Sequence, residues 1–94
     1  MIKGFKCKET EKIWNGSMSL KLPIDIQNTA RRKLRMINNA VILADLNVPP
    51  NNRLEYLQDD RKGQLSIRIN SQWRVCFIWE SGNCSDVEII DYHR

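Results

Sequence analysis

The sequence predicts an α+β fold in which a small, twisted, mainly antiparallel sheet packs against two helices from the N-terminal half. Residues 24–46 repeat their apolar side chains with the period of a helix. Residues 54–92 instead alternate apolar and polar side chains in short runs separated by turn residues. The chain has 94 residues, which is enough for one two-layer core. We therefore expect a single domain over residues 1–94.

The first elements are expected to be a short edge strand and a short helix. Residues 2–7 alternate and are rich in lysine, which suits the edge of a sheet. Residues 9–14 begin with acids, which the helix dipole favours there. Asn15-Gly16 tolerates positive φ and ends this helix, and residues 17–23 form the connection.

A long amphipathic helix is predicted from Ile24 to about Leu46, with Pro23 before it and Asp25 in its first turn. Its apolar residues recur at three- and four-residue steps, namely Ile26, Ala30, Leu34, Ile37, Val41 and Ala44. Its exposed side is expected to carry Arg31, Arg32, Lys33 and Arg35. Such a basic face is usually only solvated, although it could also meet phosphate. Pro49-Pro50 ends the helical half.

The second half is predicted to be an antiparallel meander. Strands are expected at 54–57, 65–69, 73–79 and from Val87 onward, with turns at 59–63, 70–71 and 82–83. Short links imply antiparallel neighbours, and the apolar face of the sheet needs the long helix as its cover. Trp73 and Trp79 fall in the apolar row and are expected in the core. Arg68 and Arg74 point the other way, onto a shared basic surface.

Composition limits the partners and cofactors. The formal charge of +4 and the pI near 9.2 favour a polyanion such as RNA, or an acidic protein partner. Three cysteines without a CxxC pair and a single histidine indicate neither a zinc site nor a disulfide framework, so we expect no metal and no cofactor. No apolar run is long enough for a signal peptide or a membrane span, and a cytoplasmic, soluble protein is expected.

The last four residues, Asp91-Tyr92-His93-Arg94, place a carboxylate, a phenol, the only histidine and a guanidinium after an apolar strand. Cleavage of RNA by the neighbouring 2′-hydroxyl needs a proton acceptor, a proton donor and a cation beside the phosphorus. Asp91, His93 and Arg74 supply these groups. A polar terminal tetrapeptide is nevertheless more often a solvated tail than a site.

The chain resembles the HigB-type toxins of the RelE superfamily, the plasmid maintenance killer proteins of bacterial type II toxin–antitoxin modules. The resemblance is spread along the sequence, and residues 53–93 carry most of it. The opening Met1-Ile2-Lys3, the turn Asp60-Arg61-Lys62-Gly63, the strand Trp73-Arg74-Val75-Cys76-Phe77 and the ending Asp91-Tyr92-His93 are similar to family motifs in order and spacing. Residues 9–50 match mainly in helical pattern.

The resemblance implies a RelE-like fold and a ribosome-dependent mRNA endonuclease that a HigA-type helix-turn-helix antitoxin neutralises. DNA would be bound only through the antitoxin complex, and no membrane is involved. Asp91, Tyr92 and His93 fall on family active-site positions, and Arg74 on the arginine expected to hold phosphate. Tyr92 is expected to stack on a base, a contact of about 1–3 kcal/mol. Further residues expected to contact RNA are Arg53, Gln58, Arg61, Lys62 and Arg68.

The chain departs from the family at two positions. Where known members read L-H-P-L-K, residues 54–58 have Glu55 in place of the histidine and Gln58 in place of the lysine. Glu55 could act as the general base with His93 as the acid, but an unperturbed glutamate has no proton to give at neutral pH. The sequence leaves open whether neighbouring cations compensate, whether the enzyme is slow, or whether this is a weakened toxin. A noncatalytic basic module that binds RNA or protein is the alternative.

Overall fold

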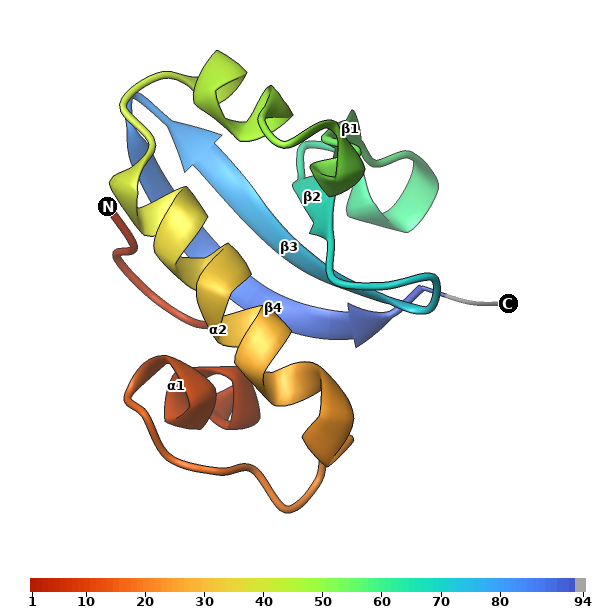
Figure 1. Cartoon of the computed structure of the whole chain (residues 1–94). Coiled ribbons are helices and arrows are strands. Elements are labelled where there is room, and N and C mark those ends of the chain that lie inside the picture. Colours follow the sequence, from red (N-terminus) through yellow and green to blue (C-terminus); the bar gives the residue numbers. More distant parts are fainter. Residues whose placement is uncertain (93–94) are drawn as a thin grey trace.

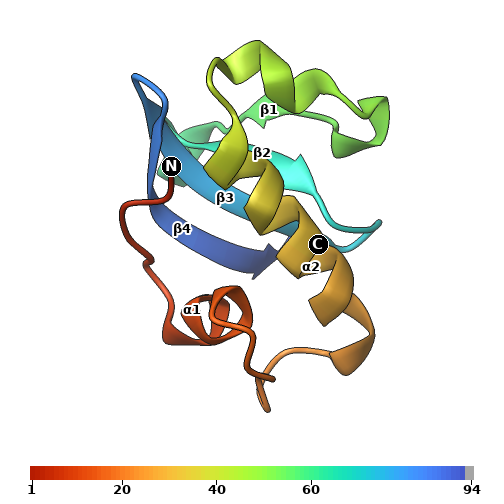
Figure 2. The same ribbon diagram turned by 60° about the vertical axis from the view of Figure 1, so that its left-hand side comes forward.

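The computed structural model describes residues 1–92, which form two α-helices, three short 3-10 helices and one four-stranded sheet (Figure 1). The strands β1 (Glu55–Tyr56), β2 (Leu65–Arg68), β3 (Trp73–Glu80) and β4 (Asn83–Asp91) lie in chain order, each antiparallel to the next. Helix α2 (Ile24–Asn39) crosses one face of the sheet, and α1 (Lys8–Trp14) packs beside α2 and β4 (Figures 1 and 2). The predicted meander with its helical cover is confirmed. In the described part of the chain, no helix is both long and apolar enough to cross a membrane.

The core lies between α2 and the sheet. Ile26, Ala30, Leu34 and Ile37 of α2 are all buried, as the helical period predicts, and they belong to the same cluster as Val75, Phe77, Val87 and Ile89 of the sheet. Each large apolar side chain removed from water contributes about 1.5–3 kcal/mol, so this cluster is the main source of stability. Trp73 and Trp79 pack against it half-buried, which confirms their structural role.

Helix α2 ends at Asn39, not near Leu46, so the predicted length was wrong. Ala40 takes an extended conformation, and the carboxylate of Asp45 accepts hydrogen bonds from the backbone of Val41 (2.9 Å) and Ile42 (3.2 Å). These bonds begin a 3-10 helix, Leu43–Asn47, which turns Leu46 into the core. Val41, predicted on the apolar face, is 77% exposed.

Residues 2–7 do not form a regular strand, so the prediction of a short edge strand over these residues was wrong. They run parallel to β4 (Figure 2) with two isolated bridges, Ile2 to Cys84 and Phe5 to Val87. Backbone bonds from Lys3 to Cys84 (2.7 Å) and from Lys6 to Val87 (3.0 Å) hold the segment there. The contacts recur every third residue because Ile2 and Phe5 both pack inward, which strict alternation does not allow.

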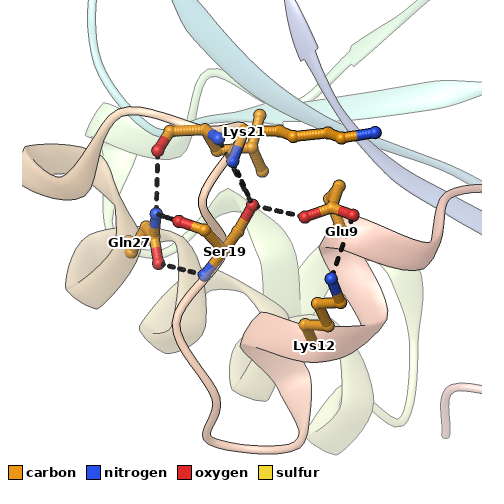
Figure 3. A network of polar contacts seen from close by, with 6 residues as sticks. Glu9, Lys12, Ser19, Lys21 and Gln27 are labelled. Atoms are coloured by element: carbon orange, nitrogen blue, oxygen red, sulfur yellow. Dashed lines mark hydrogen bonds and ion pairs between the residues drawn. The ribbon is translucent and has the colours of Figure 1, made fainter.

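The connection between the helices is fixed by buried polar groups around Ser19 (Figure 3). The Gln27 side chain accepts from the Ser19 amide (3.0 Å) and donates to the Ser19 carbonyl (2.9 Å). The Ser19 hydroxyl donates to Glu9 (2.7 Å), whose other carboxylate oxygen pairs with Lys12 (3.3 Å). The hydroxyl bond, with a smaller contribution from Lys12, holds the pKa of Glu9 below its usual value. The network therefore ties α1 to the start of α2.

The basic residues of α2 are divided between structure and solvent, so the expected common face was wrong. Arg31 donates to the backbone carbonyls of Ile13 (2.8 Å) and Ser17 (3.4 Å), and so braces α1. Lys33 is half-buried and donates to Asn52 (2.6 Å). Only Arg32 and Arg35 of the four are fully exposed.

Asn52 is the centre of a second buried network. Its side chain is 0% exposed, accepts from Lys33, and donates to the carbonyls of Leu46 (3.1 Å) and Val48 (3.3 Å). These bonds fold residues 46–52 back against α2. The next residue, Arg53, has φ 45°, the left-handed conformation that most side chains avoid. The chain then enters β1 at the edge of the sheet, paired with β2.

Candidate functional site

Arg74 is the organising residue of the face opposite the helices. Its side chain leaves β3 on the side away from the core, as predicted, yet it is only 6% exposed. Its guanidinium donates to the Ser66 hydroxyl (2.7 Å), to the Ser66 carbonyl (3.4 Å) and to the Arg53 carbonyl. All these partners are neutral, and no carboxylate forms an ion pair with Arg74 in the described chain. A buried cation without a counter-ion is costly unless an anion joins it.

A cavity of about 300 Å³ opens beside this guanidinium. We call it the arginine cavity, and its lining residues are Arg53, Arg68, Asn70, Ser71, Arg74 and Tyr92. Arg68 and Arg74 face each other as directly paired residues of β2 and β3. Arg53 reaches the same place from the strained loop. Three of the predicted residues therefore converge as cations on one space, and none of the described residues that line it carries a carboxylate.

Tyr92 forms one wall of this cavity. Its backbone amide donates to the Gln72 carbonyl (2.6 Å), which places it beside the link between β2 and β3. Its ring covers Arg74, with 5.2 Å from the guanidinium carbon to the ring centroid, a favourable cation–π distance. Its hydroxyl donates to the Glu55 carboxylate (2.8 Å) on β1. The structure thus brings together Tyr92, Arg74 and Glu55, all predicted catalytic residues.

A second cavity of about 350 Å³ lies on the other side of Tyr92. We call it the tyrosine cavity, and its lining residues are Tyr56, Leu57, Gln58, Asp59, Asp60, Arg61 and Tyr92. Arg61 is held there by an ion pair with Glu88 (2.7 Å) on β4, which raises the pKa of the guanidinium. Among the described residues, the ion pair of Arg61 therefore runs across the sheet to β4.

Four predicted residues lie outside these cavities or outside the described chain. Glu55 lines neither cavity and contacts the site only through the hydrogen bond that it accepts from Tyr92. Asp91 pairs with Trp73 in the sheet and so points to the helix-covered face, where its carboxylate accepts from Gln72 (3.0 Å). Lys62 is exposed and lines neither cavity. The prediction for His93 lies outside the described residues.

Sequence reasoning missed Ser66, Asn70, Ser71, Tyr56 and Asp59 as site residues. Ser66 stands opposite Glu55 on one side and Cys76 on the other, so strand alternation would have placed it on the arginine face once the register was known. The sequence feature that could have identified Asn70 and Ser71 was their position in the link between the strands that carry Arg68 and Arg74. Without the register, they were interpreted only as a turn.

The cysteines and acids of residues 1–92 show no arrangement of three or more side chains that would hold a metal ion. All three thiols are free, and Cys76 and Cys84 are buried. Burial raises the pKa of each of these two thiols to about 11, so they are protonated and unreactive at neutral pH.

Comparison with known proteins agrees with this architecture. Residues 3–93 match the family described as RelE-like toxin of type II toxin-antitoxin system HigB. The chain belongs to the HigB-like toxins. Since a type II module pairs a toxin with an antitoxin, membership in this family also gives the protein an antitoxin partner.

Relatives within and around the HigB-like toxins are similar over most of their length. Toxin HigB-1 of Vibrio cholerae serotype O1 is 39% identical over 79 residues, which cover 83% of each chain. Endoribonuclease HigB of Proteus vulgaris is 28% identical over 93 residues, covering 99% of this chain and 100% of that one. The crystal structure of YafQ from E. coli strain BL21(DE3) superposes with a TM-score of 0.64 at 14% identity, covering 97% of this chain and 91% of that chain. The last likeness confirms the predicted RelE-like fold.

Proposed function

We propose that this protein is an endoribonuclease that cuts messenger RNA bound to the ribosome. The reaction we propose is attack of a ribose 2′-hydroxyl on the adjacent phosphate, with no metal ion taking part. The observation that carries the proposal is the buried Arg74 guanidinium, which lines the arginine cavity without a carboxylate partner in the described chain. The name of the Proteus vulgaris relative, Endoribonuclease HigB, supports the same class of reaction.

The arginine cavity suits a phosphate of single-stranded RNA. A phosphate entering it would complete the charge balance of Arg74 and meet Arg53 and Arg68 at the same time. Guanidinium groups donate two parallel hydrogen bonds to phosphate, and their charge stabilises the negative charge that builds on phosphorus in the transition state. The Ser66 contacts hold Arg74 in place before the substrate arrives, so no reorganisation is needed during the reaction.

Glu55 is the candidate general base and His93 the candidate general acid. In this scheme the 2′-oxygen gives its proton to Glu55 and bonds to phosphorus, while the bond from phosphorus to the 5′-oxygen breaks. The 5′-oxygen takes a proton from His93, and the products are a 2′,3′-cyclic phosphate and a free 5′-hydroxyl. The Tyr92 hydroxyl orients the Glu55 carboxylate through their hydrogen bond. Asp91 then acts from outside the cavity, by fixing the β2–β3 link through Gln72.

The proposal names two partners, the ribosome and an antitoxin. Acting on ribosome-bound messenger, the protein would work in the cytoplasm, and the ribosome would supply an extended, positioned RNA strand. We further propose that the antitoxin partner is a HigA-type helix-turn-helix protein, and that DNA is bound only by the complex of the two.

The test maps the 5′ ends of cellular messenger RNA after brief expression of wild type, Glu55→Gln and His93→Ala. Glu55→Gln keeps an oxygen that can accept from Tyr92 but removes the base. General acid–base groups contribute about 10²–10⁴-fold each, so cuts inside translated codons should fall by at least about 100-fold in both variants. Arg35→Gln, an exposed cation of α2, is the matched control and should cut like wild type.

Each part of the proposal has its own contrary result. Growth arrest by wild type and both variants without new 5′ ends would leave a noncatalytic binding module. Equal cleavage of free and ribosome-bound messenger in vitro would refute ribosome dependence. Cleavage that persists at a 2′-deoxy nucleotide would refute attack by the 2′-hydroxyl.

A further inference from the structure

The tyrosine cavity is not used by the phosphate chemistry proposed above, and its surface differs from that of the arginine cavity. Tyr56 is 67% exposed and Tyr92 is 40% exposed, although Tyr56 lies on β1 and Tyr92 directly follows β4, the strand at the other edge of the sheet. The bond from Tyr92 to Glu55, the neighbour of Tyr56, holds the two aromatic residues near each other. Exposed aromatic rings beside a cavity provide surfaces on which unpaired RNA bases stack.

The wall of the tyrosine cavity is rigid. Arg61 is fixed to Glu88 (2.7 Å) and to Gln64 (3.2 Å), and Leu57 is buried with its amide bonded to the Gln64 carbonyl (2.9 Å). Asp59 adopts φ 56°, a left-handed conformation held within the 3-10 helix Asp59–Arg61. Strain kept at such a residue is typical of functional sites.

The charge of this wall favours a base over a phosphate. Glu88 neutralises Arg61, whereas no hydrogen bond or ion pair engages the carboxylates of Asp59 and Asp60 among the described residues. These carboxylates repel phosphate and accept hydrogen bonds from exocyclic amino groups, and the Gln58 amide adds a donor and an acceptor. Tyr92 lines both cavities, so a base here and a phosphate in the arginine cavity belong to neighbouring positions of one strand.

We propose that the tyrosine cavity is a base-binding subsite that selects bases with an exocyclic amino group over uracil. The base stacks against Tyr56 or Tyr92, and Asp59 or Asp60 accepts its amino hydrogens. This inference rests on the proposed function, because it assigns the nucleotide next to the phosphate that Arg74 holds.

The experiment is an NMR titration of the protein with AMP, CMP, GMP and UMP, following the ring signals of Tyr56 and the guanidinium signal of Arg74. The three amino-bearing nucleotides should shift Tyr56 with about tenfold tighter binding than UMP, the size of one base-edge contact. The combined variant Asp59→Asn, Asp60→Asn should remove this difference. Asp86→Asn is the matched control, since Asp86 is also exposed and also has positive φ (50°), but lies on β4 outside both cavities.

The outcomes separate the inference from the proposed function. Equal affinity for all four nucleotides, or a preference that survives in the combined variant, overturns the subsite. Shifts at Arg74 without any at Tyr56 overturn the subsite but agree with the phosphate site. The absence of shifts at both residues overturns the subsite, and the mapping of messenger 5′ ends then decides the function by itself.

Discussion

Replacing Asn52 with alanine should lower the free energy of unfolding by about 3 kcal/mol. The substitution leaves the buried Leu46 carbonyl without its donor, which costs about 1–3 kcal/mol. It also removes the acceptor of the half-buried Lys33 ammonium, and hydrogen bonds to charged groups contribute about 1.5–3 kcal/mol. The Val48 carbonyl is nearer the surface and adds less, because water replaces the lost donor.

This loss is large for a domain whose total stability is of the order of 5–15 kcal/mol. Chemical denaturation measures it directly, and the melting temperature should fall by about 12–24 °C. Asn51→Ala is the matched control, because Asn51 is the adjacent, exposed residue of the same type, and it should cost less than about 0.5 kcal/mol. A cost for Asn52→Ala within about 1 kcal/mol of that control would refute the role given to the network. Adding Lys33→Met to Asn52→Ala should cost less than the sum of both changes, since the two side chains share one bond.

Three further predictions concern thiols, acid stability and the end of α2. A thiol reagent at neutral pH should label Cys7 alone in the native protein and all three cysteines after denaturation, because the other two are buried; fast labelling of a second thiol would contradict this. The lowered pKa of Glu9 means that its stabilising contribution is present above the usual value of 4.5 and is lost as pH falls through the lower, folded value. Wild type and Glu9→Gln should therefore differ in stability near neutral pH and converge in acid, and a constant difference would show that titration of Glu9 is not responsible. Leu46→Ala should lower the free energy of unfolding by about 2–5 kcal/mol, and Val41→Ala by less than about 0.5 kcal/mol, as measured by chemical denaturation. If α2 continued past Asn39, Val41 would instead be the costly position.

The predictable parts of the fold were those fixed by local periodicity. The helical repeat through Ile37 and the inward-facing residues of the strand alternation follow from which side chains must leave water, and both agree with the structure. The alternation did not show that Ser66, Arg74 and Cys76 on the other face are buried as well. The end of α2 was not predictable from that repeat. Val41 falls on the apolar period, but the Asp45 carboxylate accepts a hydrogen bond from its backbone amide and caps the next turn. A side-chain hydrogen bond from four residues away does not appear in the hydropathy pattern.

The candidate site was predictable in composition but not in arrangement. Arg68 and Arg74 were placed on one face because alternation alone determines it. Their joining with Arg53 and Tyr92 depends on a left-handed residue and on the register of β4, and a single sequence specifies neither. Asp91 shows the same limit. It lies beside Tyr92 in the chain, yet its pairing with Trp73 in the sheet sets it on the helix-covered side, and among the described residues only Tyr92 of the two lines the arginine cavity.

Residues 2–6, which run alongside β4, also affect how readily copies of the protein aggregate. A sheet edge with free amides and carbonyls is a template on which a second chain can add a strand and start aggregation. Residues 2–6 occupy that edge at β4, and at the opposite edge β1 offers only the two residues Glu55 and Tyr56. Among the described residues, one edge of the sheet is therefore partly covered and the other is short, so both edges leave little free backbone on which another copy could add a strand.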